Sequence, residues 1–151
     1  MKHRPIPLQY ACLADFLLPK VLPWRKLTIA IDGVDGAGKS TLARFLSWQL
    51  EMPEIETDFF LRDDQRMPVH DTSSLATLVQ ARHKNNRPLI VEGVFVLRQL
   101  GAIGVNPEFL IRVQCKGRTG NSRWQSAFTK YRAEFPRAKT PDYTLRWAGA
   151  E

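Results

Sequence analysis

Three short apolar runs stand out along the chain, and each leads into a segment whose apolar residues recur every three or four positions. The runs are residues 27–31, 89–91 and 109–113. Continuous apolar runs are typical of strands buried on both faces of a parallel sheet, and the longer period is typical of helices that cover it. The pattern therefore predicts a mixed α/β fold. Residues 54–60 and 142–147 are weaker extended segments that would bring the sheet to five strands.

The helical segments are bounded by residues that start or stop helices. Residues 41–50 carry one apolar stripe and end before Pro53, because proline cannot continue a helix. A second helix is expected to begin at a cap formed by Ser73 or Ser74 and to end before Pro88. Both helices alternate with the apolar runs, as in units of strand, helix and strand.

A third helix is expected to begin near Asn121 or Ser122 and to carry an aromatic stripe. Its members are Trp124, Phe128, Tyr131 and Phe135. Their helical spacing favours core packing over a platform for stacking nucleic-acid bases. Residues 10–18 are predicted to form a short helix in an N-terminal extension, residues 1–26, which packs on a single domain of residues 27–151.

The segment TIAIDGVDGAGKST, between the first strand and the first long helix, matches the pattern G-x-x-x-x-G-K-[ST]. Glycines clear the way for phosphate oxygens to reach backbone N–H groups, and the positive end of the helix dipole favours an anion there. The sequence therefore predicts a nucleotide-phosphate loop. The residues expected to bind the nucleotide are Gly33, Val34, Asp35, Gly36, Ala37, Gly38, Lys39, Ser40 and Thr41.

Two residues of this loop have chemical tasks in phosphoryl transfer. Lys39 is expected to reach the β- and γ-phosphates of ATP, and the Ser40 hydroxyl is expected to ligate Mg²⁺. A GTPase is disfavoured because the sequence has no Asn-Lys-x-Asp segment for reading guanine.

Two acids close predicted strands and therefore belong to the edge of the sheet where ligands bind. They are Asp58, in EIETDFFLRDD, and Glu92, in RPLIVEGVF. Phosphoryl transfer needs a group that accepts the proton of the acceptor hydroxyl, which suits Asp58, and a carboxylate near Mg²⁺, which suits Glu92. The alternatives are that Asp58 caps a turn or helix and that Glu92 pairs with an arginine.

Four segments in this order resemble the uridine kinase-like group of P-loop small-molecule kinases, which includes uridine, pantothenate and phosphoribulose kinases. The segments are AIDGVDGAGKSTLA, TDFF, HDTSSL and LIVEGVFVL, and the resemblance covers roughly residues 27–147. It implies a three-layer P-loop NTPase fold, a five-stranded parallel sheet with helices on both faces, and ATP and Mg²⁺ as cofactors. It also implies that Asp58 is the general base and that Glu92 assists metal or substrate.

The same resemblance implies an arginine-bearing lid after the fourth strand, at residues 116–123. Its cations, which would stabilise charge on the transferred group, are Lys116, Arg118 and Arg123. Gly117 and Gly120 would let the segment move. The alternative is a solvated loop. Compared with its relatives, the chain is short between Asp58 and Glu92, which weighs against a nucleoside acceptor, and specificity is expected to lie in residues 62–70 and 95–103.

Charge and cysteine usage add two expectations. The chain has a net charge of +7, and residues 109–151 carry 9 Lys and Arg against 3 Asp and Glu. Such a basic segment suits nucleic acid, an anionic surface or closure over a polyphosphate. Cys12 and Cys115 are expected to be free core thiols in a reducing cytoplasm. No apolar run approaches the roughly 18 residues of a membrane span.

These observations favour an ATP-dependent kinase acting on a small hydroxyl compound. A nucleotide-binding regulatory module without turnover is the first alternative, because the lid is sparse in arginine and only four residues follow Trp147. A 5′-hydroxyl polynucleotide kinase is the second, because the C-terminal segment is basic.

Overall fold

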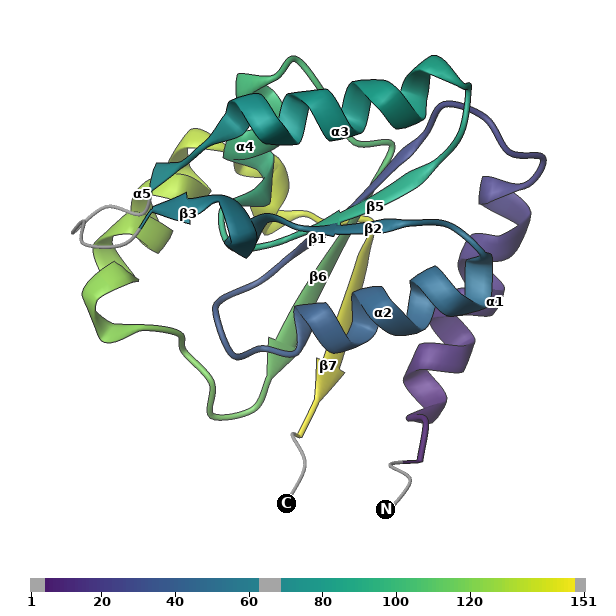
Figure 1. The fold of residues 1–151 in the computed structure, drawn as a ribbon. Coiled ribbons are helices and arrows are strands. Elements are labelled where there is room, and N and C mark those ends of the chain that lie inside the picture. The colour runs from purple at the N-terminus through teal and green to yellow at the C-terminus, as the bar shows by residue number, and fades with distance from the viewer. Residues whose placement is uncertain (1–4, 63–68, 149–151) are drawn as a thin grey trace.

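The computed structural model describes residues 5–62 and 69–148. Five parallel strands form the central sheet in the order β2-β5-β1-β6-β7, with helices on both faces (Figure 1). The strands are β1 (Thr28–Asp32), β2 (Glu54–Glu56), β5 (Leu89–Glu92), β6 (Phe109–Cys115) and β7 (Tyr143–Trp147). The predicted three-layer α/β fold with five parallel strands is confirmed.

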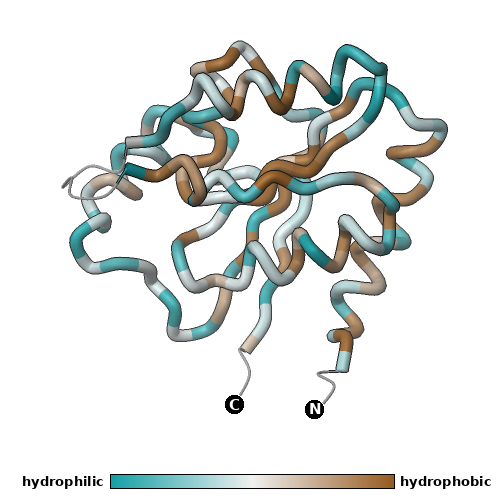
Figure 2. The backbone as a smooth tube through the Cα atoms, viewed as in Figure 1, coloured by the Kyte–Doolittle hydropathy of each residue, from teal (hydrophilic) through white to brown (hydrophobic). Residues whose placement is uncertain are grey.

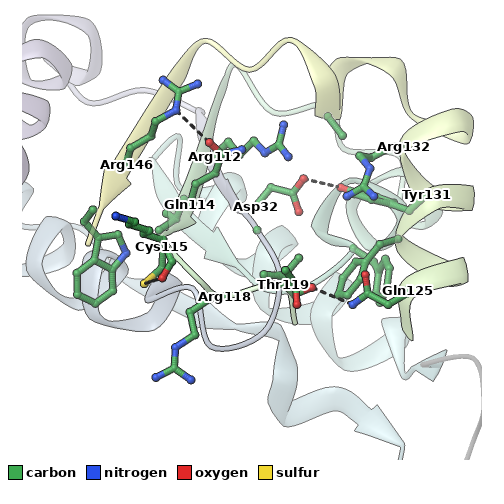
Figure 3. A pocket seen from close by; sticks show the side chains of 18 of the residues that line it. Asp32, Arg112, Gln114, Cys115, Arg118, Thr119, Gln125, Tyr131, Arg132 and Arg146 are labelled. Atoms are coloured by element: carbon green, nitrogen blue, oxygen red, sulfur yellow. Dashed lines mark hydrogen bonds between the residues drawn. The ribbon is translucent and has the colours of Figure 1, made fainter. Parts of the chain in front are cut away.

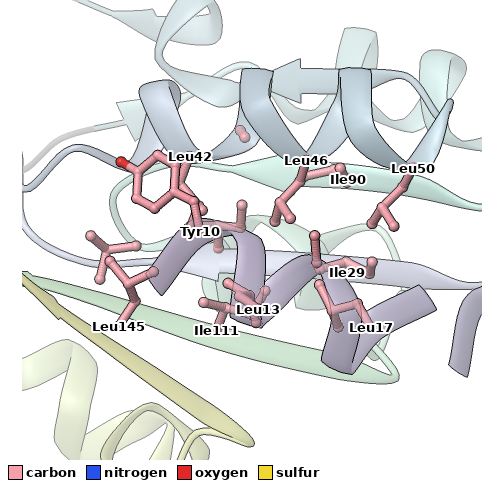
Figure 4. Close-up of a cluster of buried hydrophobic side chains, with 14 of the residues drawn as sticks. Tyr10, Leu13, Leu17, Ile29, Leu42, Leu46, Leu50, Ile90, Ile111 and Leu145 are labelled. Carbon is pink, nitrogen blue, oxygen red and sulfur yellow. The ribbon is translucent and has the colours of Figure 1, made fainter. Parts of the chain in front are cut away.

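Two hydrophobic cores join the layers, one on each face of the sheet. The helices α1 (Leu8–Val21) and α2 (Lys39–Leu50) pack on the first face, while α3 (Thr72–Lys84), α4 (Val96–Ala102) and α5 (Gln125–Glu134) pack on the second. Successive side chains of a strand point to opposite faces, so Ile29 joins the first core and Ala30 the second. Figure 4 shows the first core. In Figure 2 the central strands are among the most hydrophobic segments of the chain.

The second strand is shorter than predicted. β2 ends at Glu56, and residues 57–60 form a 3-10 turn, η1 (Thr57–Phe60), that carries Asp58. Two further short strands, β3 (Leu61–Arg62) and β4 (Val69–His70), then pair antiparallel. Thr57 is fully buried, and its hydroxyl fills the space that a side chain at Gly93 would need. This contact between the turn and the residue after Glu92 overrides the β-propensity of the segment.

Two helix boundaries also differ from the predictions. Asp71, and not Ser73 or Ser74, caps α3, because its carboxylate accepts hydrogen bonds from the backbone N–H and hydroxyl of Ser73 at 3.1 and 2.6 Å. Asn121 caps a 3-10 turn, η2 (Ser122–Trp124), ahead of α5, and a further turn, η3 (Pro136–Lys139), follows it. The aromatic stripe of this region packs in the second core, as predicted.

α4 was not predicted as a separate element, and it occupies residues 96–102 of a segment expected to govern specificity. Residues 63–68 of the other such segment lie outside the described residues. Cys115 is buried as expected, but Cys12 is exposed because it lies on the outer face of α1. Within residues 5–62 and 69–148, no helix combines the length and the apolar character needed to cross a membrane.

Candidate active site

The loop between β1 and α2 lies at the carboxyl end of the central strand. Gly38 has a φ of 96°, which favours glycine, and a Cβ on it would lie 2.5 Å from the indole ring of Trp147. The same indole donates a hydrogen bond from Nε1 to the carbonyl of Ala37 at 2.7 Å. The end of β7 therefore supports the loop just before α2 begins, where the first N–H groups of a helix are open to an anion.

Lys39 is the first residue of α2, its side chain turns back into this loop, and it is 5% exposed. Its Nζ donates a hydrogen bond to the carbonyl of Val34 at 2.8 Å. Burial lowers the pKa of Lys39, and the nearby carboxylates of Glu92 and Asp58 oppose that change. Val34 is its one hydrogen-bond partner among the described residues, so two of its three N–H donors remain for a ligand.

The structure brings together the two residues predicted to hold the metal. The Ser40 hydroxyl donates a hydrogen bond to Glu92 Oε1 at 2.6 Å. Glu92 is fully buried, and its Oε2 has no hydrogen-bond partner among the described residues. Burial raises the pKa of Glu92 to about 6, against the opposing effects of Ser40 and Lys39. Among the described residues no arginine pairs with Glu92, and its Oε2 is buried without a hydrogen bond, which costs free energy.

The hydroxyl and the unpartnered carboxylate oxygen fit the oxygen ligands that Mg²⁺ takes. No group of three or more His, Cys, Asp or Glu side chains able to hold a metal occurs in the described parts of the chain. Two protein oxygens suit Mg²⁺, which usually keeps several waters and binds phosphates as well.

Asp58 reaches the same edge of the sheet from the η1 turn. Its side chain is exposed and forms no hydrogen bond or ion pair with another described residue, so it does not act as a cap. A Cβ on Gly93, the residue after Glu92, would lie 3.7 Å from Asp58 Oδ1. Asp58 thus lies beside the end of β5 although it follows the end of β2.

His70 and Gln99 belong to this side of the site and lie in the two segments expected to govern specificity, although neither was singled out. Gln99 Nε2 donates to the carbonyl of Val94 at 2.7 Å, which fixes the orientation of the amide. The same nitrogen lies 3.2 Å from His70 Nε2, which must therefore accept the hydrogen bond in its unprotonated form. Burial lowers the pKa of His70, while Asp58 opposes this. The sequence signals were the motif HDTSSL, which begins at His70, and the position of both residues in the expected specificity segments.

Asp32, the last residue of β1, is a second functional candidate that the sequence analysis missed. It is 6% exposed and accepts a hydrogen bond from the Tyr131 hydroxyl at 3.2 Å. That hydroxyl accepts in turn from the backbone N–H of Leu97 at 3.1 Å. Burial raises the pKa of Asp32 to about 6. These bonds join the start of the loop to α4 and α5.

Asp35 ties the loop to the segment predicted to be a lid. Its Oδ1 accepts a hydrogen bond from the backbone N–H of Asn121 at 2.8 Å. Gly120 has a φ of 84°, and a Cβ there would lie within 2.9 Å of both Asp35 and Phe128, so this glycine is needed for close packing. Arg118 lines a cavity of about 720 Å³ under the loop, whereas the exposed Arg123 does not (Figure 3).

Among known protein families, curated sequences and solved structures, only solved structures match this chain. No protein-family model matches the sequence, and no curated protein sequence matches it. Among solved structures, a possible uridine kinase from Bacillus stearothermophilus aligns with a TM-score of 0.62 and 15% identity, over 91% of this chain and 100% of its own. A sugar kinase from Janibacter sp. HTCC2649 aligns with a TM-score of 0.54 and 18% identity, over 80% and 84%.

This chain shares the fold of these two solved structures, a five-stranded parallel sheet with helices on both faces. The resemblance drawn from the four sequence motifs is thereby confirmed for the fold. The loop follows β1, the middle strand of the sheet. Asp58 and Glu92 lie on its β2 and β5 side, and the 720 Å³ cavity lies on its β6 and β7 side. The residues predicted to bind metal and phosphate lie close together. Of the two predicted lid arginines, Arg118 lines the cavity and Arg123 does not.

Proposed function

We propose that this protein is an ATP-dependent phosphotransferase that transfers the γ-phosphate to a hydroxyl group of a small molecule. The observation that carries the proposal is the hydrogen bond between Ser40 and the buried Glu92, beside the exposed carboxylate of Asp58; the second oxygen of Glu92 has no partner in the described parts of the chain. A phosphate loop, a pair of oxygen ligands and an unpaired acid at one sheet edge are the parts that this reaction needs.

The loop would hold the triphosphate by its backbone N–H groups and by Lys39. The ammonium group of Lys39 already lies inside the loop, and its free N–H donors can bind phosphate oxygens in addition to the carbonyl of Val34. Ser40 and Glu92 would hold Mg²⁺, which when bound neutralises charge on the phosphates.

Asp58 would act as the general base. It would accept the proton of the acceptor hydroxyl while the oxygen forms its bond to the γ-phosphorus and the bond to the leaving ADP breaks. Its carboxylate is exposed and has no partner within residues 5–62 and 69–148, which suits it to bind the acceptor. His70, held neutral by Gln99, would line the acceptor side next to Asp58.

Arg118 would stabilise the transferred group from the opposite side of the loop. Its segment is linked to the phosphate loop by the bond from Asn121 to Asp35, so binding of phosphate and position of the arginine are coupled. Arg123 lies outside the cavity, so its role as a second such cation requires movement of η2.

The test is ADP release from Mg-ATP across a panel of nucleosides, vitamins, sugars and 5′-hydroxyl oligonucleotides. One acceptor should raise turnover in the wild type. Asp58→Asn should reduce that turnover at least a hundredfold and keep ATP binding, while Asp15→Asn, the same change at an exposed position of α1, should have no effect. Full activity in Asp58→Asn would refute the assignment of the base, and ATP binding without any stimulating acceptor would refute the kinase.

A further inference from the structure

The 720 Å³ cavity lies between the second face of the sheet and α5, on the side of the loop away from Asp58 and Glu92. Arg112 and Gln114 of β6 and Arg146 of β7 lie on one side of it, and Arg132 of α5 lies on the other (Figure 3). Phe128 of α5 also lines it. Its volume is within the range of roughly 300–1,000 Å³ that is usual for small-molecule sites.

The lining of this cavity is strongly basic. It contains five cations and one acid, Asp32. The cations are Arg112, Lys116, Arg118, Arg132 and Arg146. In the described parts of the chain, no carboxylate lies within 4.0 Å of any of these five. Arg44, Arg98 and Arg137 elsewhere in the chain, in contrast, all form ion pairs.

Unpaired cations gathered in a concave site attract anions, because the walls focus their field. Arg112 and Arg132 are half-buried, so each guanidinium is partly desolvated. No carboxylate among the described residues pairs with either one to offset that cost. Among the described residues, Arg146 donates a side-chain hydrogen bond only to a neutral group, Gln114 Oε1, at 3.1 Å. The proposed kinase reaction uses Arg118 from this set, which leaves three arginines without a task.

We propose that this cavity binds a second small molecule, a phosphate ester, with Arg112, Arg132 and Arg146 holding the phosphate. Planar guanidinium groups match the oxygens of a phosphate in paired hydrogen bonds. Phe95 and Phe128, stacked at 5.0 Å between ring centroids, offer an apolar wall for the body of the ligand. The proposal goes beyond the proposed function, because it holds equally for a chain that binds ATP without turnover.

The position of the cavity links it to the phosphate loop. Gly33 and Val34 line it, and the carbonyl of Val34 holds Lys39. A ligand that contacts this backbone would shift the carbonyl of Val34 and with it the ammonium group of Lys39. It would therefore change the affinity for ATP. By linkage, ATP changes the affinity for the ligand by the same factor. The site is thus placed to regulate the loop.

The test is calorimetric titration of protein saturated with Mg²⁺ and a non-hydrolysable ATP analogue. The probes are ribose 5-phosphate, glucose 6-phosphate and AMP, with ribose as the uncharged match. At least one ester should bind with 1:1 stoichiometry, and ribose should not. The double variant Arg112→Gln/Arg132→Gln should lose at least tenfold in affinity. Lys130→Gln/Lys139→Gln, the same charge change at exposed positions outside the cavity, should keep the affinity.

Three outcomes would overturn the proposal: no ester binds the saturated protein, an ester binds the double variant as tightly as the wild type, or the double variant loses the ATP analogue itself. The second would place the ester at the acceptor side, and the third would make the cavity part of the nucleotide site, while the proposed kinase would stand in both. Arg146→Gln, at an exposed position of β7, repeats the test with less risk to folding.

Discussion

The indole of Trp147 donates a hydrogen bond of 2.7 Å to the carbonyl of Ala37, so the last residue of β7 holds the phosphate loop in place from across the sheet. The ring also lies where a side chain at Gly38 would be. The shape of the loop is therefore determined by a residue 110 positions further along the chain, as well as by its own glycines.

Trp147→Phe should weaken ATP binding about fivefold, because it removes one hydrogen bond and keeps most of the packing against Gly38. Trp147→Ala should weaken it further, since it also leaves a cavity beside the loop. Fluorescent-nucleotide titration measures both. Trp48→Ala, at an exposed position of α2, is the control, and equal affinities in all four proteins would contradict the supporting role of Trp147.

Glu92→Gln should remove most of the effect of Mg²⁺ on nucleotide binding. ADP affinity without metal should change less than twofold, while the gain on adding Mg²⁺ should fall at least tenfold, because a neutral amide is a poorer ligand than a carboxylate. Calorimetry with and without Mg²⁺ separates the ADP affinity of the metal-free protein from the gain that Mg²⁺ gives. An unchanged Mg²⁺ effect would show that Glu92 does not contribute to the metal site.

Asp32→Asn should make the protein more stable at neutral pH. Burial raises the pKa of Asp32 to about 6, so the folded state favours the protonated acid, and this contribution is lost as the pH rises through 6. The uncharged amide avoids that loss, which a shift of roughly two pH units puts at about 3 kcal/mol at most.

The pH dependence is the decisive readout for Asp32. Urea unfolding at pH 7.5 should show a higher midpoint for Asp32→Asn than for the wild type. Near pH 4 the two midpoints should converge, because Asp32 is then protonated in the folded state. A difference that stays constant across this range would point to packing around Tyr131 and not to the charge.

Asp35→Ala should loosen the segment around Asn121. The variant removes the acceptor of the Asn121 N–H, so hydrogen exchange in residues 116–122 should accelerate severalfold. Asp35→Asn keeps an oxygen at this position and should retain most of the protection. Exchange measured by mass spectrometry compares the three proteins, and equal rates would mean that the bond does not restrain the segment.

The glycine-rich loop between β1 and α2 and the closeness of Ser40 and Glu92 could be expected from the sequence because each depends on local rules. The loop needs glycines at set spacings, and a residue that ends a buried parallel strand must lie at the ligand edge. Asp58 was placed at this edge for the wrong reason, since β2 ends at Glu56 and the turn that carries Asp58 is positioned by the contact of Thr57 with Gly93.

The parts that could not be predicted depend on contacts between distant segments. α4 has only 7 residues and contains Gly101, which lowers helix propensity, so its sequence gives too short a pattern to predict a helix. The bond between Asp32 and Tyr131 joins residues 99 positions apart, and nothing near Asp32 signals it. The basic residues after position 109 were visible as a charge excess, but only the sheet register and α5 bring them around one cavity.

The segment from Lys116 to Asn121 is fastened at both ends. Lys116 donates its backbone N–H to the carbonyl of Trp147 at 2.9 Å, and Asn121 donates its own to Asp35. The four residues between them span roughly 14 Å when fully extended. While both bonds hold, the segment behaves as a short strap with fixed anchors. Arg118, near its middle, can then move toward or away from the loop only as far as the four intervening residues allow. A larger movement requires the hydrogen bond between Asn121 and Asp35 to break.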